Sequence, residues 1–344
     1  MNFYYIYRKR LYFLLSILLF FFVTEVFAGN SLRKGTCGAL ELVIPIGSRG
    51  TSMGGAVVTD IKGTEAIYWN PAGVANSEKT EAVFSYLDYI AGIKYSFIGI
   101  TTNLGNFGSL GFNTRVVDIG DIIVTTEESP EGTGEIITPN FMIVGVTYSR
   151  QMTDRVFFGG SFSFINERIM QEVAKGVAFD FGFQYIPESS GLKFGVVMKN
   201  IGPKLRFDGS DLDKNIRLPN DDPQAAHRNA RLELSSFELP SYLQFGTSYD
   251  VKIDENKKLI LAGSFRNNNF FSDEFSGGIE FNFKDEFMLR GGYLTSSEKE
   301  YIYGFNFGFG LCLHFGENTL AFDYSNAQTK YFDNNQWFTL KLSF

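Results

Sequence analysis

The sequence has 344 residues and a net charge of −7, with 44% hydrophobic and 16% aromatic residues, 36 glycines and two cysteines. An acidic chain of this kind argues against binding to nucleic acid, and two cysteines exclude a disulfide-rich framework. The mean hydropathy of −0.05 does not exclude a membrane protein, because an alternating strand averages near zero while it presents one apolar face.

The first predicted element is an export signal over residues 1–28. A basic triplet at residues 8–10 precedes an apolar run over residues 11–23, and a pattern typical of signal-peptide cleavage ends at Ala28. The alternative is a membrane-spanning helix, but such a helix needs about 20 apolar residues and the run is well short of that length. Cleavage would remove three basic side chains and Glu25, which leaves 28 basic and 37 acidic side chains and a net charge of −9.

Residues 29–79 show no alternation and hold the densest glycine clusters of the chain. Glycine lets two backbones approach closely or adopts positive φ, and Asn-Pro favours a turn, so we expect a compact, loop-rich plug, or hatch, in the mouth of a barrel. The first cluster is not a phosphate-binding loop, because no predicted strand leads into it and no Gly-Lys-Ser/Thr ending follows. The candidate plug residues are Gly47, Arg49, Gly50, Met53, Gly54, Gly55, Ala56, Asn70, Pro71, Ala72 and Gly73.

Residues 80–344 repeat one theme, alternating runs separated by turn residues. They predict an all-β protein, a transmembrane antiparallel β-barrel of about fourteen strands, and an even number is usual for bacterial outer-membrane barrels. The strands are predicted near residues 81–89, 93–104, 107–117, 139–151, 155–170, 175–186, 191–201, 239–251, 257–268, 273–283, 286–295, 301–315, 317–327 and 334–344.

The run from Tyr301 to Phe315 is the clearest of these strands. Every odd position is large and apolar or aromatic, while the even positions include Gly304, Asn306 and His314. The run is longer than the roughly 9–11 residues that cross a bilayer as a tilted strand. We therefore expect all the odd positions to face lipid. A soluble β-sandwich would use the same alternation, but it would not require strands of this length.

Short and long connections alternate along the chain. Tight turns are predicted around residues 153–154, 254–256, 284–285 and 316–317, and long polar stretches cover residues 118–138 and 202–238. Outer-membrane barrels have short periplasmic turns and longer external loops. This pattern predicts a bacterial outer-membrane protein, surrounded by lipid, with both ends of its barrel on the periplasmic side.

Charged residues collect on the predicted inner faces of the strands. A lipid-facing surface tolerates them poorly, because a basic residue at mid-depth costs about 2–4 kcal/mol. We expect these groups to form charge pairs that hold a hydrated interior and the plug. The candidate lumen charges are Arg115, Asp180, Lys193, Lys199, Arg266, Glu280, Arg290 and Asp323.

No catalytic or metal-binding constellation is found in the sequence. The two histidines, His227 and His314, lie neither in a metal-ligand spacing nor beside a nucleophile pattern. We therefore expect a protein that is not an enzyme and has no cofactor.

The last strand ends on an aromatic residue, with large apolar residues alternating with polar ones. It resembles the terminal β-signal by which the outer-membrane assembly machinery recognises a barrel, which makes that machinery an expected partner. The residues of this predicted signal are Phe338, Leu340, Leu342 and Phe344.

The two cysteines allow two interpretations. Cys37 lies in the plug segment and Cys312 is predicted to face inward near a periplasmic turn. A disulfide between them would tie the plug to the wall in an oxidising compartment. The alternative is two unpaired thiols, because the Cα separation of about 5.5–6 Å that a disulfide requires cannot be read from a sequence.

The glycine-rich segment also resembles a known family. Residues 47–56 are similar to the opening motif G-x-R-x-x-x-M-G-G-A, and residues 70–73 to the NPAG element, of the PorV/PorQ family, which is itself similar to long-chain fatty acid transporters of the FadL type. Further similar stretches are residues 131–135, 176–182 and 200–203, so the resemblance covers most of the mature chain. It implies a fourteen-stranded, FadL-like barrel with an N-terminal hatch.

Two functions follow as hypotheses. The resemblance implies a role in type IX protein secretion, in which the external loops bind secretion components or hand over exported cargo proteins. The alternative is a transporter of hydrophobic small molecules through the hatch and the barrel. A transporter of lipids should offer an apolar pocket inside, whereas the predicted wall is charged, and this contrast favours the secretion role unless the plug builds the pocket.

Overall fold

The computed structural model describes residues 33–187, 191–216, 228–298 and 300–344. The predicted export signal, residues 1–28, lies outside the described residues. The N-terminal part of the described chain, residues 33–79, consists of short helical turns and loops, and the remainder is almost entirely β-structure.

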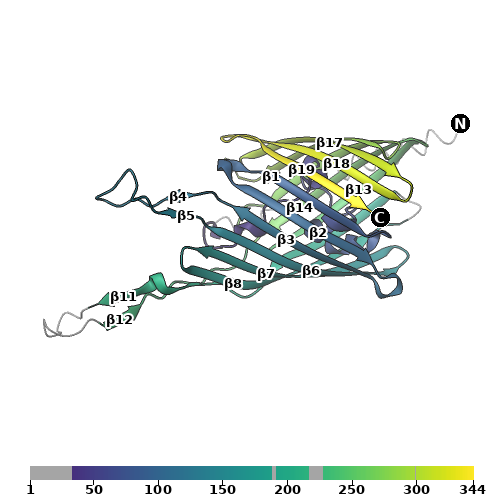
Figure 1. Ribbon diagram of the computed structural model, residues 1–344. Coiled ribbons are helices and arrows are strands. Elements are labelled where there is room, and N and C mark those ends of the chain that lie inside the picture. The colour runs from purple at the N-terminus through teal and green to yellow at the C-terminus, as the bar shows by residue number, and fades with distance from the viewer. Residues whose placement is uncertain (1–32, 188–190, 217–227, 299) are drawn as a thin grey trace.

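Within the described ranges, fourteen long antiparallel strands close into one barrel, which confirms the predicted fold class (Figure 1). Neighbouring strands pair in chain order, and the barrel closes where β1 pairs with β19. Beyond the last ladder pair, Thr80 and Phe344 exchange two backbone hydrogen bonds of 2.9 and 3.1 Å. The barrel strands are β1 (Glu81–Asp88), β2 (Lys94–Asn103), β3 (Ser109–Asp118), β6 (Asn140–Thr153), β7 (Val156–Ile169), β8 (Glu172–Tyr185), β9 (Leu192–Ile201), β13 (Tyr242–Asp254), β14 (Lys257–Asn268), β15 (Glu274–Phe283), β16 (Phe287–Ser296), β17 (Tyr303–Phe315), β18 (Asn318–Thr329) and β19 (Asn335–Ser343).

The outer surface of the barrel is a belt of apolar side chains. Phe305 and Phe307 of β17 are 65% and 57% exposed, while the intervening Asn306 is buried. Phe181 and Phe183 of β8 alternate in the same way with the buried Gln184. A closed wall with an apolar outside and a polar inside is the architecture of an outer-membrane barrel, because every backbone group is paired within the sheet and only apolar groups meet lipid.

The prediction that Tyr301 and Tyr303 face lipid is wrong. The register between β17 and β18 shifts between Tyr303 and Asn306, so three positions on β17 match two on β18. This β-bulge reverses the facing of the residues before it. The hydroxyl groups of Tyr301 and Tyr303 consequently bond to inward-facing groups, Glu274 at 3.0 Å and Tyr89 at 2.8 Å.

The two ends of the barrel differ. The long connections between β3 and β6 and between β9 and β13 project from one end, and they carry two small hairpins (Figure 1). The opposite end has short turns and the C-terminus. The long-loop end is therefore the extracellular end. The elements of the connections are η5 (Ile90–Gly92), η6 (Gly105–Phe107), β4 (Ile122–Ile123) paired with β5 (Ile136–Ile137), β10 (Phe207–Asp208), η7 (Ser210–Leu212), and β11 (Asp213–Ile216) paired with β12 (Arg228–Arg231).

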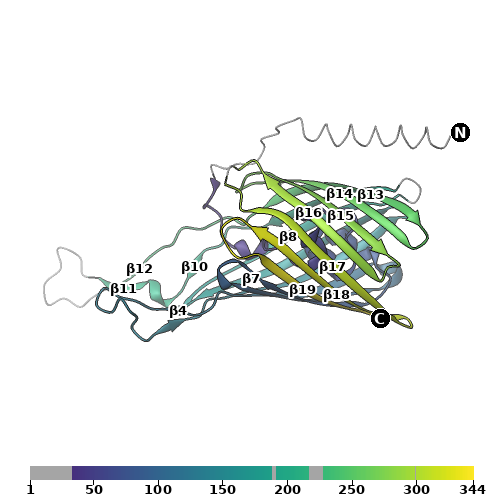
Figure 2. The same cartoon turned by 90° about the horizontal axis from the view of Figure 1, so that it is seen from above.

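Most of residues 33–79, the plug segment, lies inside the barrel, where both views show its helical turns enclosed by strands, while its first residues lie at the long-loop end (Figures 1 and 2). The plug segment enters from the extracellular end, since Arg33 pairs with Glu238 of the long β9–β13 connection, and it reaches the periplasmic end before β1. In the described part of the chain no helix is long and apolar enough to span a membrane. The helical elements of the plug are η2 (Leu40–Leu42), α2 (Ser48–Ser52), η3 (Gly63–Glu65), α3 (Ala66–Trp69) and η4 (Pro71–Asn76).

Inward-facing glycines of the wall form seats for the plug. A Cβ atom added to Gly182 would lie 2.0 Å from Oδ1 of Asn70, and one added to Gly292 would lie 2.4 Å from the backbone nitrogen of Gly54. Only glycine allows so close an approach. The wall therefore fixes the position of the plug through its backbone. The glycines with such contacts to the plug are Gly99, Gly111, Gly159, Gly182, Gly195, Gly246, Gly278, Gly292 and Gly308.

A pair of neighbouring glycines on β16 tests these seats. Gly292→Leu should prevent the plug from seating and lower the free energy of unfolding by about 1–3 kcal/mol, the usual cost of overpacking. Gly291→Leu is the matched control, because Gly291 faces outward and an added Cβ would meet nothing within 4 Å. The measurement is the temperature at which the folded, heat-modifiable form is lost during gel electrophoresis. Equal transition temperatures for the two variants would contradict the seating role.

Candidate functional site

The interface between the plug and the inner wall is the candidate functional site, and its centre is an ion-pair network around Arg49 of α2. The guanidinium of Arg49 lies 2.9 Å from Glu280 of β15 and 2.7 Å from Asp60 of the plug. Arg290 of β16 pairs with the same Glu280 at 2.7 Å and also with Asp323 of β18. Since all five groups are almost fully enclosed, each charge depends on its partners, and the network anchors the plug to β15, β16 and β18.

A second polar group anchors the plug to β8 and β9. The buried Lys199 lies 3.6 Å from Asp180, donates a hydrogen bond to the backbone carbonyl of Tyr68, and has its ammonium group 3.9 Å from the centre of the Tyr68 ring. Arg115 of β3 approaches the same ring at 5.7 Å. Two cations against one aromatic ring hold α3 by cation–π attraction.

The Asn-Pro-Ala-Gly turn is bonded directly to the wall. The side chain of Asn70 donates to the carbonyl of Val58 in the plug at 2.7 Å and to that of Phe183 in β8 at 3.1 Å, and it accepts from the amide of Ala72. Asn70 thereby caps η4, which begins with Pro71. Gly73 is required for close packing, because an added Cβ would lie 2.1 Å from the carbonyl oxygen of Ile61.

The glycine-rich stretch over residues 47–56 lies along β15 to β19. Its glycines Gly47, Gly54 and Gly55 have φ values of 76°, 66° and 82°, which favour glycine. Gly50 packs on the Trp69 ring, and Met53 and Ala56 are buried. The amide of Gln244 on β13 donates to the carbonyl of Gly55 at 3.1 Å.

One side of the lumen is apolar. A hydrophobic cluster joins the plug to β1, β2, β3, β18 and β19, and it is built largely of aromatic and branched residues. The sequence predicted a charged wall and left open that the plug builds an apolar pocket, and the plug does supply half of an apolar interface. The wall residues of this apolar cluster are Val83, Leu87, Tyr95, Phe97, Val117, Ala327 and Trp337, and the plug residues are Ile46, Met53, Val57, Ile61, Ala66, Ile67, Tyr68, Trp69 and Val74.

A second, smaller apolar cluster lies towards the extracellular end, under the connection between β9 and β13. It joins Leu42 of the plug to Ile143 and Ile165 of the wall and to Leu205 and Leu239 of the connection. The pairing of β8 with β9 beside this cluster is irregular, because the register shifts between Phe179 and Phe181. The extracellular part of β8 pairs with β10 instead of β9.

The apolar side is closed at its periplasmic end by polar groups. Lys341 of β19 pairs with Glu65 of the plug at 3.0 Å, and Glu81 of β1 accepts a hydrogen bond from the amide of Thr64 at 2.7 Å. The hydroxyl of Thr64 also lies 2.9 Å from that of Thr101 on β2. These contacts, the periplasmic closure, seal the apolar interface from the periplasm.

Glu41 is a buried carboxyl near the extracellular end of the plug. Its side chain is 3% exposed, and its Oε1 has no hydrogen-bond partner among the described residues. Burial, reinforced by the neighbouring Glu167 carboxylate of β7, raises the pKa of Glu41 to about 8. Burial thus favours the protonated, uncharged form of Glu41 in the folded protein.

The remaining predicted lumen charges also lie inward. Lys193 pairs with Asp250 at 2.9 Å, and Arg266 pairs with Glu274 at 2.9 Å and lies 4.5 Å from the centre of the Tyr242 ring. Arg266 borders an interior hollow of about 10 Å³, which is about the room one water molecule needs. In this conformation that hollow is too small for a solute.

Of the two interpretations of the cysteines, the structure agrees with two unpaired thiols. Cys37 and Cys312 are both free. The backbone of Cys37 forms an isolated parallel β-bridge with Glu238 of an extracellular connection. The backbone amide of Cys312 donates a hydrogen bond to the carbonyl of Glu286 in a periplasmic turn. The two thiols therefore lie at opposite ends of the barrel. A disulfide, the other interpretation, would require the plug segment to begin near the periplasmic end.

The residues of the predicted β-signal, Phe338, Leu340, Leu342 and Phe344, are exposed on the outer surface. The intervening Thr339 and Lys341 face the plug. This placement leaves the apolar row available to lipid or to an assembly partner.

Sequence reasoning missed the plug's own acidic residues, Glu41, Asp60 and Glu65. Asp60 follows Val57-Val58-Thr59 and precedes Ile61, and a charge within such an apolar stretch was the signal that could have identified a buried partner for Arg49. In the described ranges, no three His, Cys, Asp or Glu side chains are grouped so that they could hold a metal ion.

The fold is similar to that of known hydrocarbon channels, although no protein-family model and no curated protein matches the sequence. The CymD monoaromatic hydrocarbon channel superposes with a TM-score of 0.55 and 11% identity, over 88% of this chain and 97% of that chain. The Pseudomonas putida toluene transporter TodX superposes with a TM-score of 0.50 and 12% identity, over 86% of this chain and 96% of that chain. A Pseudomonas aeruginosa FadL homologue superposes with a TM-score of 0.50 and 11% identity, over 88% of this chain and 98% of that chain. At such identities the similarity concerns the fold, which is a FadL-like outer-membrane barrel.

Removing the charge of Arg49 should release the plug from its main anchor. Arg49→Met leaves Asp60 without its partner, and breaking a buried ion pair in this way costs about 3–5 kcal/mol. The double variant Arg49→Met/Asp60→Asn should recover part of that loss, because no orphaned carboxylate remains. Denaturant unfolding of the detergent-solubilised protein measures both. A loss below 1 kcal/mol in Arg49→Met would contradict the anchoring role.

Glu41 should make stability depend on pH. An unfolded glutamate has a pKa of about 4.3, so between that value and about pH 8 the folded protein keeps a proton that the unfolded chain releases. Stability therefore falls as pH rises through this window. Glu41→Gln should reduce the drop in thermal transition temperature between pH 5 and pH 9. An exposed loop variant, Glu128→Gln, is the control, and an unchanged drop in Glu41→Gln would refute the assignment.

Proposed function

We propose that this protein transports hydrophobic small molecules across the outer membrane, along the apolar side of its lumen. The observation that carries the proposal is the apolar cluster between the plug and β1, β2, β3, β18 and β19. The lumen of a porin is polar and filled with water. An apolar interface that parts and closes would instead offer a passage to a molecule that avoids water.

The fold supports this proposal independently. CymD and TodX, with which the barrel superposes, are described as a monoaromatic hydrocarbon channel and a toluene transporter. The proposed class of transported molecule is accordingly small and hydrophobic.

The contacts suggest an order of events along the passage. A molecule would first meet the smaller apolar cluster around Leu42, Leu205 and Leu239, below the extracellular loops. It would then pass between the plug and β1–β3. Release would require the periplasmic closure at Thr64 and Glu65 to open, while the Arg49 network and Lys199 hold the opposite side of the plug in place.

The secretion-associated role implied by the sequence resemblance is the second hypothesis. No observation in the structure favours it over transport, and the comparisons do not support it. The two hypotheses separate in a deletion strain, in which impaired uptake of apolar compounds with normal surface delivery of exported proteins supports transport, and the reverse result overturns it.

A disulfide across the periplasmic closure should stop transport. In a background with Cys37→Ser and Cys312→Ser, the pair Thr64→Cys/Thr101→Cys places two thiols where hydroxyl oxygens lie 2.9 Å apart. Oxidation should abolish the uptake of a radiolabelled aromatic hydrocarbon by whole cells, and reduction should restore it. Full uptake by the oxidised protein would contradict a passage beside β2.

Two other cysteine pairs serve as controls for this experiment. Ser264→Cys/Ser276→Cys links β14 to β15 without touching the plug, since those hydroxyls lie 2.7 Å apart, and it should leave uptake unchanged. Thr59→Cys/Ser248→Cys links the plug to β13, on the side held by the ion pairs. Uptake through the oxidised form of this pair is expected to persist, and its loss would mean that the plug moves as one unit.

A further inference from the structure

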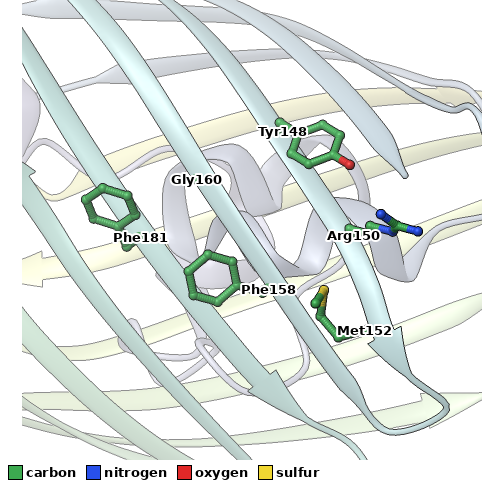
Figure 3. Close-up of a pocket in the computed structure, with 6 residues that line it drawn as sticks. All are labelled: Tyr148, Arg150, Met152, Phe158, Gly160 and Phe181. Carbon is green, nitrogen blue, oxygen red and sulfur yellow. The ribbon is translucent and has the colours of Figure 1, made fainter. Parts of the chain in front are cut away.

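A hollow of about 390 Å³ lies on the outer surface of the barrel over β6, β7 and β8 (Figure 3). It is lined by outward-facing residues of the wall and includes no residue of the plug. The hollow is therefore separate from the proposed passage through the lumen. The lining residues are Tyr148, Arg150, Met152, Phe158, Gly160 and Phe181.

Gly160 forms the floor of this outer hollow. Gly160 pairs directly with Tyr148 of β6 and with Phe181 of β8. Phe158 lies two residues before it, on the same face of β7. A Cβ atom added to Gly160 would meet its nearest atoms at 3.7 Å, an ordinary van der Waals contact. The glycine is therefore not needed for closure of the wall, unlike the inward glycines that seat the plug. Its effect is to leave a space between aromatic rings.

Arg150 provides a charge at the periplasmic edge of the hollow. It is exposed, lies opposite Phe158 in the register, and stands between Tyr148 and Met152 on the outward face of β6. The part of the chain that the structure describes supplies no carboxylate partner for it. A basic side chain on the lipid-facing surface is costly at mid-depth and tolerated near the interface. β6 ends three residues later at Thr153, so Arg150 lies at that interface.

The wall of the hollow is held in place by the neighbouring periplasmic turn. The hydroxyl of Tyr148 donates a hydrogen bond of 2.8 Å to the backbone carbonyl of Phe107 in the turn between β2 and β3. This bond fixes the ring at one side of the space.

We propose that this hollow binds one glycerophospholipid of the periplasmic leaflet, with an acyl chain over Gly160 and the phosphate on the guanidinium of Arg150. The planar guanidinium offers paired donors that match a phosphate. The aromatic rings and Met152 match hydrocarbon. The position at the periplasmic rim selects a lipid whose headgroup lies at that depth.

Native mass spectrometry of the purified full-length barrel with added phosphatidylglycerol tests this proposal. The wild-type protein should retain one tightly bound lipid. Arg150→Gln and Gly160→Leu should each weaken its binding by at least about tenfold, because the first removes a charge-assisted contact and the second fills the hollow. Binding of the lipid to both variants with wild-type affinity would overturn the proposal.

Matched variants separate this site from general contact with lipid. Arg168→Gln removes an exposed arginine at the other end of β7, and Gly263→Leu fills an outward glycine of β14, where the nearest atom to an added Cβ lies at 3.8 Å. Both should bind like the wild type, and equal losses in these controls would overturn the proposal. Heat-modifiable migration checks that each variant is folded. Should Gly160→Leu not fold, the surface variant Arg150→Gln decides the outcome.

Discussion

Closure of the sheet is the constraint on which the rest of the molecule depends. Lipid offers no hydrogen-bond partners, so the backbone of a membrane-spanning wall must pair entirely within itself. The pairing of β1 with β19, completed by Thr80 and Phe344, meets this requirement. Closure also fixes the size of the lumen. The plug must therefore fit a space that cannot expand, and inward glycines such as Gly182 and Gly292 allow its backbone to approach the wall.

The plug is held differently on its two sides. Towards β15, β16 and β18 it is fixed by enclosed charges around Arg49, and towards β8 and β9 by Lys199. Towards β1, β2 and β3 the contact is an apolar cluster, with hydrogen bonds of the plug to Ser85, Glu81 and Thr101 beside it. Ion pairs and hydrogen bonds fail when their geometry changes by a small distance, whereas an apolar interface can accept another apolar surface in its place. In the transport proposal, this asymmetry would make the charged side the anchor of the plug and the apolar side the passage.

The barrel could be predicted from the sequence because alternation reports directly on facing. Phe305, Phe307 and the charged positions Arg290 and Asp323 were placed on their faces by a period of two alone. The β-bulge that turns Tyr301 and Tyr303 inward was missed, since an extra residue leaves no mark in the alternation of large side chains. Likewise, Asp60 as the partner of Arg49 depends on how residues 33–79 fold within the lumen. The choice between a disulfide and two free thiols stayed open because local sequence does not state from which end the plug enters.

The strength of the contacts along the plug indicates where movement begins. At the extracellular end Arg33 pairs with Glu238 and Lys34 with Glu298, and each of these side chains is more than a third exposed. Exposed pairs of this kind contribute about 0–1 kcal/mol, whereas breaking an enclosed pair such as Arg49 with Glu280 costs about 3–5 kcal/mol. The start of the plug at Arg33 and Lys34 can thus separate from the extracellular loops while α2 stays anchored. Under the transport proposal, a molecule admitted there would reach the apolar side without breaking the ionic anchor, and the pair of Glu65 with Lys341 would be the last barrier before the periplasm.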